Sequence, residues 1–521
     1  MPTYTAPGVY VEEVASTQKV LTAAPTAVAA FVGFTERYPM DDPLDPEGLA
    51  PRLVTSWTQF EQLYGSFVPG AMLPLSVFGY FQNGGSIAYI VRVPHTSPSG
   101  QPSTVALPAA DRALGNPVSV ESIEPDAVLS IGVQPEEPAG DDAPVTFRLD
   151  VYEGKDIVES YPGLTFAGPG EAGAAINGTS TRIKVKVEVS ADADLAAQLE
   201  LLRPGAYDLA WATPVPMEVS GRAFAGSESS RRGIGGLAIA EDVTIVMVPD
   251  LITAATKEDG SIDLGLWKAV QTSLISHCEQ YTNRMAILDA PPGMGPQQIK
   301  EWRSDTAMYD SAFAALYYPW IKVENPVGTG GDREVLIPPS GHIAGLWART
   351  DATRGVWKAP ANDILRGVLD IERTITQNEQ SLLNPIGINC IRPFGVRGIR
   401  VWGARTLASD TDWNYINVRR LFNMAEKTIL DGTQWAVFEP NDVPLWEGVK
   451  RTLNAFLRGL WTEGALAGTT PDQAFYVKCD AETNPPESVD TGKLVVEVGL
   501  APSKPAEFVI FRIAQHKQSA A

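Results

Sequence analysis

The amino-acid sequence predicts a multidomain protein that combines an α/β domain with α+β and β-rich parts. Three observations predict this class. The chain has 521 residues, enough for three or four domains of about 150 residues each. Buried strands alternate with helices over residues 220–390, which is typical of a parallel sheet covered by helices. Residues 96–219 instead hold short strands in which polar and apolar residues alternate.

Charge and composition exclude several classes of function. The 62 Asp and Glu against 41 Lys and Arg give a net charge of −21, which repels phosphate, so we expect no nucleic-acid partner. The three cysteines (278, 390 and 479) lack CxxC spacing and the four histidines are scattered, so we expect no metal and no cofactor. We find no signal peptide and no apolar run of membrane-spanning length, so we expect cytoplasmic assembly without membrane insertion.

The two ends of the chain carry β-prone segments. Residues 9–14 (VYVEEV) follow a Pro-Gly turn signal, and residues 507–513 read as a final strand. A lone terminal strand leaves backbone groups unpaired, so each segment needs another sheet to join. The expected domains are a 1–20 N-terminal arm, a central α/β domain of 21–95 plus 220–394, a β-rich inserted outer domain of 96–219, a C-terminal α+β domain of 395–501, and a C-terminal strand and arm of 502–521.

The periodicity within these domains predicts individual elements. We expect strands at 29–34, 86–93, 145–152, 182–189, 243–248, 285–288, 474–479 and 494–500, and helices at 58–64, 265–281, 413–430 and 443–464. On the last helix, apolar residues cluster on one face. The stripe roughly opposite that face holds Glu447, Arg451, Asn454 and Arg458.

Several ordered stretches resemble the sheath proteins of contractile phage tails and related injection systems. They are PGVYVEEV (7–14), AFVGFTE (30–36) with FQNGGSIAYIVRV (81–93), PPSGHIAGLWARTDATRGVWKAPAN (338–362), and the run from GIRVWGARTLASD (398–410) to GLAPSKPAEFVIFRI (499–513). The resemblance fails only over about 96–219, where sheath proteins vary. It implies a non-enzymatic subunit with a subtilisin-like α/β central domain. Such subunits polymerise as six-fold helical rings around an inner tube, in a metastable extended state that contracts and drives the tube into a target.

The resemblance also implies partners and contact residues. The partners are other copies of the chain, the inner tube protein, and the baseplate and cap or terminator proteins of a phage tail or tail-like particle. The arms of neighbouring subunits exchange strands, which assigns that role to Val9, Tyr10, Val11, Val14, Phe508, Val509, Ile510 and Phe511. Since the C-terminal domain of such proteins lines the inner wall, we expect Arg451 and Arg458, flanked by Lys450, to face the tube.

Three other interpretations deserve a test. Asp250, His277 and Ser340 occur in the chain order of a subtilisin-like hydrolase, although geometry rather than order decides a triad. The insertion 96–219 is either a carbohydrate- or receptor-binding module or a decorative outer domain. The arginines at 392, 397, 400, 405, 419 and 420 depart from the acidic average, and we expect them to pair with carboxylates across subunits or at the tube rather than to bind nucleic acid.

Overall fold

The structure is a computed structural model in which the chain forms two compact units. One unit is Pro25–Arg420, and the other joins the segment up to Ala24 to everything from Leu421 onward. The described residues are 21–510 without 37–38, 40–44, 46–47, 68–69, 94–101, 110–117, 125–128, 137–145, 154–155, 165–170, 188–201, 210–218, 258 and 327–332.

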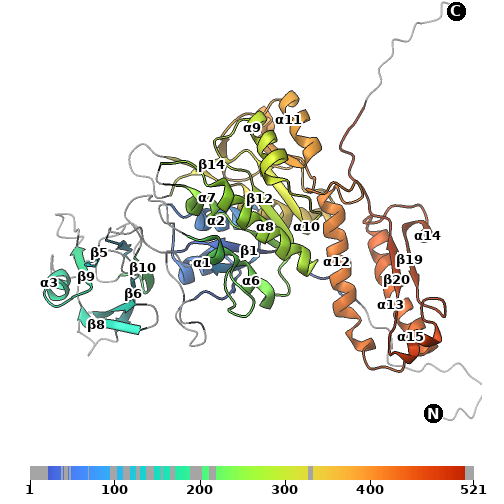
Figure 1. The fold of residues 1–521 in the computed structure, drawn as a ribbon, viewed down its shortest axis with the longest axis horizontal. Coiled ribbons are helices and arrows are strands. Elements are labelled where there is room, and N and C mark those ends of the chain that lie inside the picture. The colour runs from blue at the N-terminus through green and yellow to red at the C-terminus, as the bar shows by residue number, and fades with distance from the viewer. Residues whose placement is uncertain are drawn as a thin grey trace, which may run out of the picture. The chain divides into compact units, whose positions relative to one another are not determined.

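An eight-stranded sheet organises the first unit (Figure 1). Its order is β18-β17-β13-β12-β11-β1-β3-β2, and the inner neighbours from β17 to β3 run parallel. Short antiparallel strands close both edges. The strands are β1 (Val28–Gly33), β2 (Arg52–Val54), β3 (Ile87–Arg92), β11 (Ile245–Met247), β12 (Met285–Asp289), β13 (Ala314–Tyr318), β17 (Ile388–Pro393) and β18 (Ile399–Trp402).

Helices cover both faces of this sheet because its strands are apolar on both sides. Along β1, Ala30 and Val32 join the core that contains Trp267 of α8 (Leu264–Tyr281). Ala29 and Phe31 join the opposite core, which α2 (Leu73–Asn83) and α10 (Ser340–Arg354) cover.

Further helices of this unit are α1 (Trp57–Tyr64), α5 (Gly221–Ala225), α6 (Gly233–Gly236), α7 (Leu251–Ala255), α9 (Pro296–Glu301) and α11 (Gln377–Leu383). A small sheet pairs β14 (Ile321–Glu324) with β15 (Glu334–Ile337) and β16 (Val368–Ile371). The predicted parallel α/β arrangement is confirmed.

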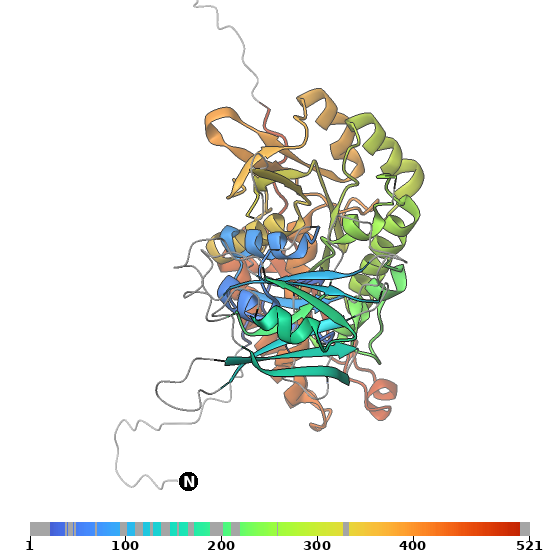
Figure 2. The same ribbon diagram turned by 90° about the vertical axis from the view of Figure 1, so that its left-hand side faces the viewer.

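The segment between β3 and α5 is an insertion, because β1 pairs with both β3 and β11, and α5 and α6 already contribute Phe224 and Ile234 to the core of the central sheet. It contains two small sheets, β10-β6-β7-β8 and β4-β5-β9, which share one hydrophobic core (Figure 2, teal). Phe147 and Tyr207 are buried in that core. The strands are β4 (Thr104–Leu107), β5 (Val118–Ser122), β6 (Leu129–Glu136), β7 (Thr146–Glu153), β8 (Asp156–Leu164), β9 (Ile183–Val187) and β10 (Gly205–Asp208), with helix α3 (Glu171–Asn177).

The C-terminal part begins in α12 (Ile416–Gly432), which crosses the boundary between the units. It continues with α13 (Val443–Thr462), α14 (Pro471–Ala474), β19 (Phe475–Lys478), α15 (Pro486–Asp490) and β20 (Glu497–Leu500). Two features differ from the sequence expectation. Strand β18 belongs to the central sheet, so the units divide after Arg420 and not after residue 394. Residues 507–510 form no strand, and the rest of the predicted strand 507–513 lies outside the described residues.

Candidate assembly surfaces

Asp250 is a buried structural cap at the end of β11. Its carboxylate accepts the backbone N–H groups of Phe34 (2.6 Å), Leu73 (3.3 Å) and Met72. Burial raises the pKa of Asp250 to about 7, and the three N–H donors act in the opposite direction. A Cβ atom on Gly33 would lie 2.2 Å from the Asp250 carboxylate, so the backbone at Gly33 closely approaches the Asp250 side chain. Asp250 therefore joins three chain segments within the subunit.

His277 and Ser340 have different partners from Asp250. His277 lies in α8 and accepts a hydrogen bond from Arg284 (Nη1–Nε2, 2.9 Å); burial and the Arg284 charge lower the pKa of His277 to about 4. Ser340 begins α10, and its N–H donates to Asp289 Oδ1 at 2.9 Å. Within the described part of the chain, no hydrogen bond joins any two of Asp250, His277 and Ser340. The structure does not assemble the hydrolase triad that their order suggested.

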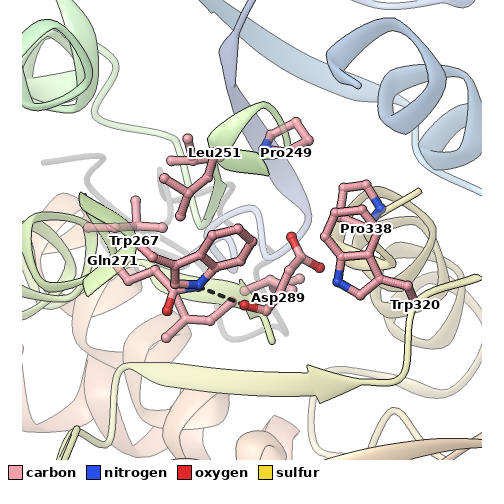
Figure 3. Close-up of a pocket in the computed structure, with 11 residues that line it drawn as sticks. Pro249, Leu251, Trp267, Gln271, Asp289, Trp320 and Pro338 are labelled. Carbon is pink, nitrogen blue, oxygen red and sulfur yellow. Dashed lines mark hydrogen bonds between the residues drawn. The ribbon is translucent and has the colours of Figure 1, made fainter. Parts of the chain in front are cut away.

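The carboxyl ends of β11 and β12, where open α/β sheets bind substrates, are filled by side chains (Figure 3). Burial raises the pKa of Asp289 there to about 7, and Gln271 donates to the Asp289 carbonyl at 2.8 Å. Trp267, Trp320 and Pro338 surround the remaining space, which is about 10 Å³, room for about one water molecule. This end of the sheet is a packed core.

The described residues hold neither a cluster of metal ligands nor a helix that could span a membrane. No three histidine, cysteine or carboxylate side chains gather there as metal ligands. None of the helices in that part of the chain is both long and apolar enough to cross a membrane.

Helix α13 has the two faces that its sequence predicts. Its buried face includes Leu445, Val449, Leu453, Leu457 and Leu460. Glu447, Arg451 and Arg458 are exposed, and Lys450 pairs with Glu447 (Nζ–Oε1, 2.5 Å), which raises the pKa of Lys450. Neither Arg451 nor Arg458 forms an ion pair with any described residue. The exposed arginine stripe is confirmed, and its contact with a tube stays a prediction.

Among the described residues, no third strand covers either edge of the small sheet in the C-terminal unit. Strands β19 and β20 pair only with each other among the described residues, in antiparallel register from Phe475↔Leu500 to Lys478↔Glu497. Further along the chain, Phe508, Val509 and Ile510 are 72%, 69% and 79% exposed. An open strand edge and an exposed apolar segment are each templates for another chain. The remaining strand-exchange candidates, Val9, Tyr10, Val11, Val14 and Phe511, lie outside the described residues.

Part of the arginine stretch lies inside the subunit, so the expectation of pairing across subunits or at the tube was wrong for Arg419 and Arg420. Arg420 is buried against Asp351 (Nη1–Oδ1, 2.9 Å) and lies over the Trp347 ring at 4.7 Å. Arg419 is buried, with the rings of Phe313 and Trp413 4.8 and 4.4 Å from its guanidinium. These two arginines hold their own subunit together.

Comparison with known proteins gives the family. Residues 240–407 match the phage tail sheath protein central domain, and residues 408–516 match the phage tail sheath C-terminal domain. Together these matches cover more than half of the sequence. Among structures, the helical sheath of the anti-feeding prophage in its contracted state is 26% identical, with a TM-score of 0.58 over 99% of this chain and 100% of that one. A chain in the six-fold symmetrised baseplate of the same prophage gives 26% identity and a TM-score of 0.55 over 99% of this chain and 100% of that one.

Curated relatives agree with these matches. The tail sheath protein of Burkholderia phage BcepMu is 30% identical over 236 residues, which are 43% of this chain and 48% of that protein. The tail sheath protein of Vibrio phage KVP40 is 30% identical over 182 residues, 34% of this chain and 26% of that protein. The match thus spans a quarter to a half of these relatives. The chain belongs to the contractile tail sheath family.

Proposed function

We propose that this chain is a non-enzymatic sheath subunit of a phage tail or tail-like injection particle. It polymerises as six-fold helical rings around an inner tube, is held in a metastable extended state, and contracts to drive the tube into a target. The observation that carries this proposal is the similarity, over nearly the whole chain, to the subunit of a helical sheath in its contracted state. Its partners are further copies of itself, the inner tube, the baseplate and a cap or terminator protein, and assembly takes place in the cytoplasm.

Strand exchange links the subunits in this proposal. The open edges of β19 and β20 accept strands from other copies, and the exposed segment Phe508–Ile510 is one donor. The N-terminal arm, with Val9–Val14, is the second donor. Main-chain hydrogen bonds supply the affinity, and a strand on a tether stays paired while subunits rotate. Contraction requires this combination, because neighbours must move without separating.

The tube contact is polar and weak for each subunit. Arg451 and Arg458 are exposed on one stripe of α13 and have no carboxylate partner in the part of the chain that the structure describes, which supports their assignment to acidic groups on the tube. Exposed ion pairs contribute about 0.2–1 kcal/mol each, and many subunits acting together multiply this small energy. Such a contact holds the extended state and still releases during contraction.

In this proposal, the central domain has a subtilisin-like fold and a structural role. The parallel order of β3, β1, β11, β12 and β13 and the helices on both faces support that relation. The separate partners of Asp250, His277 and Ser340 support a role without catalysis.

Deletion of residues 1–14 tests the proposed assembly. The truncated chain should remain a folded monomer and lose polymerisation, because the arm contributes bonds between subunits and little to the core. Tubes of normal length from the truncated chain would refute strand exchange.

Assembled particles should contract in acid, denaturant or heat without nucleotide, since the energy is stored in the lattice. A strict need for ATP during contraction would exclude stored energy.

A further inference from the structure

The hairpin between β17 and β18 concentrates positive charge in an acidic protein. Its register places Arg392 directly opposite Arg400, and Arg397 lies in the turn between them. The tip residue Val396 is fully exposed. Like charges directly opposite on paired strands destabilise the pair. The hairpin therefore retains an electrostatic cost that an outside anion would relieve.

Neutral groups, and not carboxylates, hold these arginines. Arg392 donates to the Ile375 carbonyl at 2.9 Å and to Gln380 Oε1 at 2.8 Å. Arg400 donates to the carbonyls of Arg397 and Asn362, both at 2.9 Å. None of the three arginines forms an ion pair with a described residue. Their charges are fixed in position, and no carboxylate among the residues that the structure describes pairs with them.

The carboxylates of the adjoining segment, residues 363–379, have other partners. Asp363 pairs with Arg349 at 3.2 Å, and Asp370 lies 3.6 Å from Lys322. Glu372 Oε1 accepts the N–H of Gly293, and Glu379 caps α11 through Thr376. These contacts leave the hairpin arginines without an anion from their own neighbourhood.

Aromatic packing makes the hairpin rigid before any partner arrives. The guanidinium groups of Arg392 and Arg397 lie 5.5 and 5.0 Å from the Phe394 ring, and that ring lies 4.4 Å from the ring of Trp402. Side chains that are already ordered lose little conformational entropy on binding. Gly395 and Gly398, at φ of 57° and 77°, form the turn that presents Val396 and Arg397.

We infer that the tip of the β17–β18 hairpin docks onto an acidic surface of a second copy of this chain. The argument for this occupant is charge complementarity: the chain carries a net charge of −21, so a second copy offers carboxylates in excess. A nucleic acid also has the required sign, but the surrounding acidic protein repels it. The inference rests on the proposed function, since it names one contact within the sheath polymer.

Photo-crosslinking in assembled tubes tests the inference. A benzoyl-phenylalanine at position 396 projects from a fully exposed site, so folding should be unaffected. With isotope-labelled and unlabelled chains mixed before assembly, we expect crosslinks between copies into a peptide rich in Asp and Glu. A crosslink into nucleic acid, a crosslink only into the inner tube, or no crosslink between copies would overturn the inference.

Charge reversal gives an independent readout. Val396→Asp with Arg397→Glu should raise the concentration needed for tube formation about tenfold, and salt of about 1 M should weaken wild-type assembly in the same direction because it screens exposed charges. Arg354→Glu, on the exposed last turn of α10, is the control and should assemble normally. Normal assembly of the double variant would contradict only the hairpin contact. Failure of the wild type to assemble would contradict the proposed function, and this inference with it.

Discussion

The central unit and the C-terminal unit differ in the size of their sheets and in how much apolar surface they leave exposed. The central sheet has eight strands, and its buried Asp250 and Asp289 carboxylates accept hydrogen bonds from its own backbone. The C-terminal unit has a sheet of two strands, and two strands alone are marginally stable. It also exposes the apolar segment Phe508–Ile510. The first unit satisfies these buried carboxylates within one chain, whereas we propose that the second is completed by another chain.

The largest effect should follow from removing one backbone donor in the exposed segment. Val509→Pro removes an N–H group that a strand-exchanged segment donates. We expect loss of tubes with an unchanged unfolding transition of the subunit. Val509→Thr is the matched control, because it keeps the N–H group and a β-branched side chain, and it should form tubes. Equal tube yields from the two variants in electron micrographs would show that this segment does not pair.

A second change should damage the central unit and spare the C-terminal one. Asp250→Ala leaves three buried N–H groups without an acceptor, and each unsatisfied group costs about 1–3 kcal/mol. We expect the unfolding free energy of the central unit to fall by about 3 kcal/mol or more in urea. The amides of Phe34, Met72 and Leu73 should exchange faster with deuterium. Asp259→Ala, on an exposed turn, should change neither quantity, and an equally small effect at Asp250 would refute its role as a cap.

The pH dependence of stability tests whether the Asp289 carboxyl is buried in the central unit. Burial raises the pKa of Asp289 to about 7 in the folded chain, whereas the unfolded group titrates near 4. Between these values the folded state binds more protons, so the contribution of Asp289 to stability is full below pH 4 and falls as pH rises toward 7. Asp289→Asn removes this titration. The free energy of unfolding of this variant should therefore increase relative to that of wild type as pH rises from 4 to 7. A stability difference that stays constant with pH would contradict the assignment.

The smallest effect per subunit should come from the α13 stripe. Arg451→Glu with Arg458→Glu should leave folding unchanged, since both side chains are exposed. Each lost pair amounts to about 0.2–1 kcal/mol, so we expect fewer extended, tube-filled particles and more contracted or empty ones. Lys493→Glu is the control for a charge reversal elsewhere on the unit. Normal numbers of extended, tube-filled particles from the double variant would exclude this stripe as the tube contact.

Local pattern was sufficient to predict the parts of the fold that local forces determine. The apolar run Val28–Gly33 became a buried parallel strand, and the periodicity of Val443–Thr462 gave the helix and both of its faces. Longer-range partners could not be predicted. Arg420 pairs with an aspartate 69 residues away, and the four residues of β18 do not indicate which sheet they join. Residues 507–510 of the expected strand at 507–513 form no strand in the single subunit, which agrees with the proposal that this segment pairs with another chain.

Negative-stain electron microscopy of the purified full-length chain tests the central claim most directly. If the C-terminal unit is completed by other copies, the images should show long hollow tubes with six-fold rings. These tubes should be absent when residues 1–14 are deleted. Discrete globular particles from the full-length chain, at every protein and salt concentration tried, would contradict the account.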